Sequence, residues 1–261
     1  MMRAGWQQLL RFVALLALSL LALQLYFALR IALMLAVDLQ STSFQRSEAW
    51  RLLTQQHRLL WSQQWVGYER ISSHLKRAVI ASEDAAFIDH SGVDWEALEK
   101  AWEKNVRAQA RAERINERLA QRHGARAATA PKPPRQAVPK VIGGSTITQQ
   151  LAKNLFLDGE RSLARKGQEF FITFMLEALL PKQRILEIYL NNVEWGEGVF
   201  GAQAAARHYF HVDAAQLGAY PAARLAVMLP APKRFEKRPD SPYVSGRAGT
   251  IVARMAAVDL P

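Results

Sequence analysis

A long apolar segment near the N-terminus is the feature that most constrains this chain. Residues 12–29 are apolar except for Ser19 and Gln24, and the apolar character continues from residue 31 to 37 beyond Arg30. About 20 apolar residues are enough to cross the hydrocarbon core of a bilayer as a helix. The segment is longer than the apolar part of a secretory signal and lacks a clear cleavage site, so it predicts an uncleaved anchor.

Basic residues in front of this segment indicate how it is oriented. Arg3 and Arg11 precede it, and the cytoplasmic loops of membrane proteins carry an excess of Arg and Lys. We therefore expect a cytoplasmic N-terminus, a single pass through the membrane, and export of everything after Asp38. The alternative, a buried helix of a globular protein, is disfavoured because the segment is apolar without a polar stripe.

Composition divides the chain into three parts. Residues 1–38 are expected to form a cytoplasmic stub and the transmembrane anchor, and residues 39–70 a membrane-proximal connector. Residues 71–261 form one domain, with a basic insert at about 103–140 that holds ten basic and three acidic residues. Tryptophan is favoured at lipid interfaces, so the connector is expected to rest on the membrane through Trp50, Trp61 and Trp65.

The charge of the chain limits the class of partner. A formal net charge of +11 calls for an acidic partner, which is nucleic acid, an anionic membrane or a phosphate-bearing substrate. Export of the basic domain argues against nucleic acid. The chain has no cysteine, which excludes disulfides, cysteine nucleophiles and thiolate metal sites.

The first candidate for a functional site is the stretch from residue 83 to 92. Read as a helix, it places Glu83, Phe87 and His90 on one face. A carboxylate, an aromatic ring and an imidazole on one face are poorly suited to a core, which favours a functional surface. The alternative is a helix end near solvent that stops at Gly92.

The second candidate follows two glycines at residues 143 and 144. Thr146 and Gln149 have the spacing of a capping box, which predicts the start of a helix. One face of that helix carries Thr146, Gln150 and Lys153, with Asn154 beside them. Backbone N–H groups at a helix start, with a lysine one to two turns later, suit a bound phosphate.

The third candidate is a second carboxylate that follows a run of cations. Arg161, Arg165 and Lys166 precede Glu169, which opens a segment, residues 169–177, that is apolar nearly all round. We expect this segment to be a central, buried helix. The alternative for Glu169 is a purely structural ion pair with Arg165, one turn earlier. Every clear segment in the chain is helical, and no run is convincing as a strand.

These blocks occur together in a known order. EDAAFIDHSG, GGSTITQQLAKN, RKGQE, KQRILEIYLN and GEGVFGAQAAARHYF, spread over roughly residues 71–232, resemble the bacterial peptidoglycan glycosyltransferases of family 51 in their stand-alone form. The resemblance implies an all-α, lysozyme-like fold. It also implies polymerisation of lipid II in the periplasm, at the inner (cytoplasmic) membrane. Such enzymes transfer with inversion to the 4-hydroxyl of an acceptor, form β-1,4 linkages and release undecaprenyl pyrophosphate.

The resemblance also assigns roles to residues. It makes Glu83 the base that takes the proton of the acceptor hydroxyl, and Glu169 the second carboxylate, close to the donor pyrophosphate. The substrate-binding set that it implies is Asp84, Phe87, His90, Ser145, Thr146, Gln150, Lys153, Asn154, Arg161, Arg165 and Lys166. Pyrophosphate chemistry often recruits Mg²⁺ or Mn²⁺, and Asp84 or Glu169 would lie near such an ion. No cluster of ligands is legible, so the metal stays an open question.

Two other functions are compatible with part of these observations. A lysozyme-like lytic glycosidase also uses carboxylates, but it has no need of a cation cluster. A non-catalytic anchored scaffold for cell-wall proteins would not depend on Glu83. The expected partners are therefore lipid II, the nascent glycan and membrane lipid, with other cell-wall synthesis proteins as a further class and no nucleic acid.

Arginines recur through the basic insert at helical spacing. As a helix, they form one cationic stripe beside a thin apolar patch. They are Arg107, Arg111, Arg114, Arg118, Arg122 and Arg126. The stripe is either the solvated face of a surface helix or a contact with anionic lipid or acidic glycan.

Overall fold

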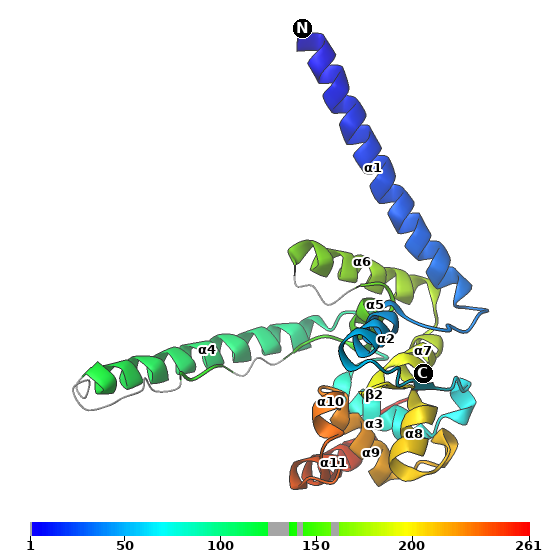
Figure 1. The fold of residues 1–261 in the computed structure, drawn as a ribbon, viewed down its shortest axis with the longest axis vertical. Coiled ribbons are helices and arrows are strands. Elements are labelled where there is room, and N and C mark those ends of the chain that lie inside the picture. Colours follow the sequence, from blue (N-terminus) through cyan, green and yellow to red (C-terminus); the bar gives the residue numbers. More distant parts are fainter. Residues whose placement is uncertain (1, 125–135, 140–142, 158–161) are drawn as a thin grey trace. The chain divides into compact units, whose positions relative to one another are not determined.

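The computed structural model describes residues 2–124, 136–139, 143–157 and 162–261. The chain forms two compact units, one of Met1–Gly92 with Thr146–Pro261 and the other of Val93–Ser145 (Figure 1). The helices of the first unit are α1 Met2–Leu33, α2 Ser43–Gln56, α3 Ser73–Glu83, α5 Ile147–Phe156, α6 Leu163–Leu179, α7 Lys182–Asn192, α8 Ala202–Phe210, α9 Ala219–Met228, α10 Pro232–Phe235 and α11 Pro242–Met255, with the short 3-10 helices η1 Tyr68–Arg70 and η2 Ala214–Gln216. Of the residues predicted to act, Arg161 and Arg126 lie outside the described part of the chain.

The apolar N-terminal segment forms helix α1, which is long and apolar enough to cross a membrane between Gly5 and Leu33. Most of its aliphatic side chains are exposed, and only its C-terminal part packs on the unit. There, Phe27 meets Phe156 of α5 edge-on at 5.1 Å. The amides of Gln24 and Gln168 on α6 exchange hydrogen bonds of 3.0 and 3.1 Å. The predicted anchor is therefore a helix whose C-terminal part packs against the first unit.

Residues 39–70, predicted to be a connector, contain a capped helix and contact the rest of the first unit. Helix α2 starts with a complete capping box between Thr42 and Gln45. Trp61 packs against Phe200 at 4.9 Å, and the Arg184 guanidinium lies 5.3 Å from the Trp65 ring. Two of the three tryptophans expected to rest on lipid thus contact the domain itself, while the third, in α2, is 68% exposed.

A small sheet corrects the expectation that the chain has no strands. Strands β1 Ser62–Gln63, β2 Glu194–Gly196 and β3 Val199–Phe200 pair in the order β1-β3-β2, parallel between β1 and β3 and antiparallel between β3 and β2. Strands of two or three residues are too short for an alternating pattern to show in a sequence. Gly198 closes the tight β2–β3 turn with φ +73°, and a Cβ there would lie 2.3 Å from the Leu60 carbonyl oxygen.

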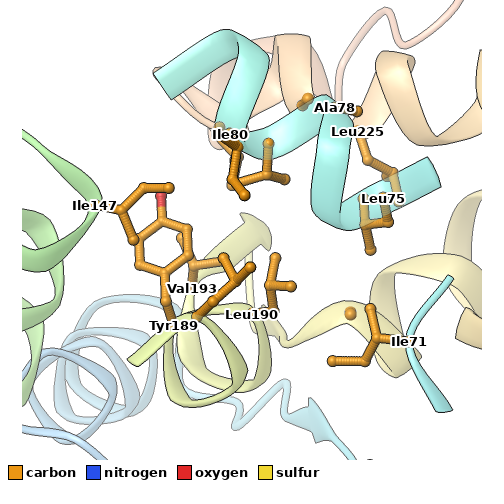
Figure 2. Packing of buried hydrophobic residues seen from close by; sticks show 14 of the residues in the cluster. Ile71, Leu75, Ala78, Ile80, Ile147, Tyr189, Leu190, Val193 and Leu225 are labelled. Carbon is orange, nitrogen blue, oxygen red and sulfur yellow. The ribbon is translucent and has the colours of Figure 1, made fainter. Parts of the chain in front are cut away.

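The core of the first unit lies between two groups of helices. Helices α3, α9 and α11 pack on one another, while α5 packs on α6 and α7. Figure 2 shows Leu75 and Ile80 of α3 facing Leu190 of α7, with Leu225 of α9 beside them. Burial of these aliphatic side chains is the main stabilising contribution to the unit.

Two predicted elements differ from the structure. Helix α3 ends at Glu83, and residues 84–92 form turns instead of continuing the helix. Helix α6 is not buried all round, since Phe171 is 62% exposed and Phe174 is 46% exposed. Its covered stripe, which includes Glu169 and Ile172, is the side that other helices of the unit pack against. A sequence that is apolar nearly all round does not reveal which side of the helix lacks a protein partner.

The second unit is built on one long helix, α4 Trp95–Gly124. The Asp94 carboxylate caps its start by accepting the Ala97 N–H at 2.8 Å. Residues 136–139 run along the helix, where the Asn116 amide exchanges hydrogen bonds of 3.0 and 2.7 Å with the Ala137 backbone. The helix therefore continues through most of the predicted arginine stripe.

Candidate active site

The turns at residues 84–92 are shaped by contacts to residues far away in sequence. Asp84 is buried, and its Oδ2 accepts the Ile147 N–H at the start of α5 at 2.9 Å. Its Oδ1 lies 2.8 Å from His90 Nε2. His90 Nδ1 accepts the Gly92 N–H at 3.1 Å, so the imidazole proton is on Nε2 and is donated to Asp84. This carboxylate therefore ties the turn to α5.

Phe87 belongs to the core, which corrects the expectation that its ring lines a functional surface. It is fully buried, and Lys182 Nζ lies 4.5 Å from its ring centroid. The same ammonium donates to the His90 carbonyl at 2.6 Å and to Glu177 Oε1 at 2.9 Å. Phe87 and His90 thus fix the path of the chain directly after Glu83.

Glu83 is the last residue of α3 and faces α5. Gln150 Nε2 donates to Glu83 Oε2 at 3.0 Å, and Gln150 Oε1 accepts the Tyr189 hydroxyl at 2.9 Å. Burial raises the pKa of Glu83, the hydrogen bonds from Gln150 and Ser82 act in the opposite direction, and the nearby Asp84 charge adds to the increase. The result is a partly buried carboxylate with a raised pKa.

A cavity of about 390 Å³ opens next to Gln150. Helices α2, α5 and α6, strand β2 and the segment around α10 contribute its walls. Its polar lining consists of Ser47, Gln150, Lys153, Asn154, Arg165 and Glu194. Its apolar lining consists of Phe44, Leu157, Val193, Leu229 and Pro232. Four residues of the predicted substrate-binding set therefore line one cavity. Glu83 is hydrogen-bonded to one of them, Gln150.

Cations gather around Glu169 at this cavity. Arg165 Nη1 lies 3.2 Å from Glu169 Oε2, and Lys166 pairs with Oε1. Arg165 Nε is buried and makes no hydrogen bond to the part of the chain that the structure describes. Desolvation lowers the pKa of Lys153, as do the charges of Arg165 and Lys166, while Glu169 opposes them. Glu169 does form the ion pair considered as its alternative role, and the pair holds a cation that lines the cavity.

Glu194 was not singled out from the sequence, yet it lines the same cavity. Its side chain is 8% exposed, and its Oε1 makes no hydrogen bond. Lys233 Nζ forms a long ion pair of 3.5 Å with this atom and a closer one with Glu48. Burial raises the pKa of Glu194 to about 7; Lys233 opposes the increase and Glu48 adds to it. A lone glutamate in a strand of three residues gives no sequence signal.

The remaining predicted residues have other positions. Thr146 caps α5 by accepting the Gln149 N–H at 3.2 Å, and it donates to the Gly92 carbonyl at 2.6 Å. Ser145 belongs to the second unit, where it is exposed. Nothing is assigned to Arg161, which lies outside the described residues.

Asp84 and Glu169, the two carboxylates considered for a divalent cation, both contact other parts of the protein. Both oxygens of Asp84 and both oxygens of Glu169 already have protein partners. Within the described ranges, no three His, Asp or Glu side chains are grouped so that they could hold a metal ion.

The chain is similar to proteins of one known family. A family model described as transglycosylase matches residues 52–114 and 125–256. The chain is 50% identical over 241 residues to a biosynthetic peptidoglycan transglycosylase of Burkholderia pseudomallei, covering 92% of this chain and 83% of that protein. It is 46% identical over 249 residues to the Paraburkholderia xenovorans protein of the same name, covering 95% and 91%. The helical fold is the all-α, lysozyme-like class that the motifs predict. The chain belongs to the transglycosylase family.

Proposed function

We propose that this protein polymerises the glycan strands of peptidoglycan from lipid II. The sugar–pyrophosphate bond of one lipid II is replaced by a β-1,4 bond to the 4-hydroxyl of an acceptor, with inversion and release of undecaprenyl pyrophosphate. The observation that carries the proposal is the cavity, which joins a basic carboxylate, through Gln150, to Lys153 and Arg165. Family membership supports the same reaction.

Glu83 is the base in this mechanism. Its carboxylate takes the proton of the acceptor hydroxyl as the hydroxyl oxygen attacks the anomeric carbon. The bond from that carbon to the pyrophosphate oxygen breaks, and the electron pair leaves with the pyrophosphate. The raised pKa of Glu83 favours proton uptake by the carboxylate.

The cations stabilise the leaving group. Pyrophosphate gains negative charge as its bond to the sugar breaks, so preorganised positive charge lowers the barrier. Lys153 and Arg165 line the cavity, and Lys166 is held beside them by Glu169. We assign to Glu169 the task of orienting Arg165 and Lys166 through its two oxygens.

We place the protein in the bacterial inner membrane as a single-pass protein with a cytoplasmic N-terminus and a periplasmic domain. Helix α1 has the length and composition of a membrane span, and Arg3 and Arg11 precede its apolar part. Helix α6 packs against α1 and leaves Phe171 and Phe174 exposed. An apolar face beside a membrane anchor suits contact with lipid, and lipid is where the undecaprenyl chain of the substrate resides.

The full-length protein in detergent, incubated with labelled lipid II alone, tests the proposal. We expect a ladder of lengthened glycan, and loss of about 10²–10⁴ in rate for Glu83→Gln, the typical range for a positioned base. The exposed Glu69→Gln is the matched control and should retain full activity. Preformed glycan is offered in a separate reaction, and its shortening, with no lengthening of lipid II, would favour a lytic glycosidase. Full activity of Glu83→Gln would remove it from the base role, and a parallel lipid II reaction in EDTA tests whether a divalent cation takes part.

A further inference from the structure

Among the described residues, two that line the cavity each have a buried polar atom that makes no hydrogen bond. The atoms are Arg165 Nε, a donor, and Glu194 Oε1, an acceptor. In the part of the chain that the structure describes, one other buried side-chain atom is in this condition, Arg224 Nε. Buried polar groups are nearly always hydrogen-bonded, so an unpaired donor and an unpaired acceptor in one cavity point to a ligand that supplies both partners.

The fold holds Glu194 at the cavity despite the cost of burying it. Strand β2 pairs with β3 through Glu194 and Phe200, with an irregularity between Glu194 and Gly196. Its neighbours in the chain, Val193 and Trp195, are both buried in the unit. The backbone therefore leaves the carboxylate little freedom to move to solvent.

The only cation paired with this oxygen among the described residues is distant and shared. Lys233 Nζ forms a long ion pair of 3.5 Å with Glu194 Oε1 and a closer one with Glu48, which Arg51 also contacts. The carboxylate of Glu194 thus keeps its capacity to accept a hydrogen bond.

We propose that Glu194 is a positioning residue that accepts a hydrogen bond from a hydroxyl or acetamido N–H of the donor sugar, whose phosphate binds at Lys153 and Arg165. This inference rests on the proposed function and adds to it a sugar-recognition site. The ligand it fits is a glycosyl phosphate, with the anion at the cations and a polar sugar edge at Glu194. The apolar walls from Phe44 and Leu229 suit the C–H face of a pyranose ring.

The discriminating experiment compares two ligands that share their lipid and pyrophosphate. Lipid II carries the sugars, and undecaprenyl pyrophosphate does not. Binding of both to the full-length protein in detergent is measured for wild type, Glu194→Ala and Lys153→Ala. A hydrogen bond to a charged group supports a loss of about 10- to 100-fold. We expect Glu194→Ala to lose that much affinity for lipid II and less than about twofold for undecaprenyl pyrophosphate.

Lys153→Ala is the matched contrast and should weaken both ligands. Equal losses for the two ligands in Glu194→Ala, or no loss for either, would overturn the sugar contact. Glu194→Gln keeps the volume and a neutral acceptor, so a smaller sugar-dependent loss is expected there, and it serves as the test if the alanine variant does not fold. Polymerisation by wild type is measured in the same preparation. If wild type polymerises lipid II but the Glu194 variants affect binding of lipid II and undecaprenyl pyrophosphate equally, this inference alone is refuted. If wild type does not polymerise lipid II, the proposed function is refuted and the inference with it.

Discussion

Replacing Glu194 by glutamine should stabilise the protein, and the gain should depend on pH. Burial raises the pKa of Glu194 from 4.5 to about 7. Between these values the native state binds more protons than the unfolded state, so stability falls as pH rises. At 1.36 kcal/mol for each pKa unit, the full cost of the charge is about 3 kcal/mol above pH 7 and about zero below pH 4.5. An uncharged amide of the same size avoids that cost.

Thermal unfolding of the two full-length proteins in detergent measures the difference. For a chain of this size, 1 kcal/mol shifts the melting temperature by about 2–4 °C. We therefore expect Glu194→Gln to melt roughly 6–12 °C above wild type at pH 8, with the gap closing as pH falls to 4.5. Tryptophan fluorescence follows the domain, since Trp195 is buried beside residue 194.

Glu197→Gln is a control of opposite sign. The hydrogen bond from Arg51 lowers the pKa of Glu197, with burial opposing it and Gln56 adding to it. Its charge stabilises the fold above the ordinary carboxyl pKa, and that contribution is lost as pH falls through the lowered value. This variant should gain no stability at pH 8. An equal gain for Glu194→Gln at pH 4.5 and pH 8 would show that the carboxylate of Glu194 is not destabilised by its burial, and the reasoning would be wrong.

Three further predictions concern other parts of the protein. Gly92 has φ +88°, and a Cβ there would lie 2.7 Å from Thr173 Cγ2, so Gly92→Ala should lower the free energy of unfolding by at least about 1–2 kcal/mol in a denaturant titration. Gly246 lies in helix α11, where an added Cβ meets open space, so Gly246→Ala should raise the free energy of unfolding by about 0.5–1 kcal/mol. Activity should rise with pH through the raised pKa of Glu83, and Gln150→Ala, which removes a hydrogen bond to the ionised carboxylate, should move this rise to higher pH. Glutamine at four arginines of α4 should lower polymerisation on anionic vesicles at low salt and hardly change it in detergent at high salt, because membrane attraction is screened by salt; an identical loss in both assays would exclude an electrostatic role. The four arginines to replace are Arg107, Arg111, Arg114 and Arg118.

Helical spacing was enough to predict which polar residues would meet on α5. Gln150, Lys153 and Asn154 follow at steps of three and one in a segment whose capping box sets its first turn, so their common face was legible from sequence. The structure adds that all three line one cavity. The long apolar helix α1 was equally legible, because its length and composition need no tertiary context.

The turns after Glu83 could not be predicted in this way. Local spacing favours a helix there, but Asp84 bonds to the Ile147 N–H, 63 residues later in the chain. The same holds for α6. Its apolar sides look alike in sequence, although the Phe171 side chain is exposed and Ile172 is fully buried. In both places the outcome is decided by partners that are distant in sequence.

The three glutamates of the site differ in how many oxygens the protein leaves available, and this difference matches the roles proposed for them. Glu169 has both oxygens occupied by Arg165 and Lys166, so it can orient cations but cannot accept a proton from substrate without releasing one of them. Glu83 has one oxygen held by Gln150 and the other in a long 3.5 Å contact with Ser82, which fixes the carboxylate and leaves room for an incoming hydroxyl. Glu194 makes no hydrogen bond through its buried oxygen, which suits a contact that only bound sugar completes. Since a buried acceptor is costly until it is paired, the order of availability predicts which carboxylate the substrate touches and which one acts only through its neighbours.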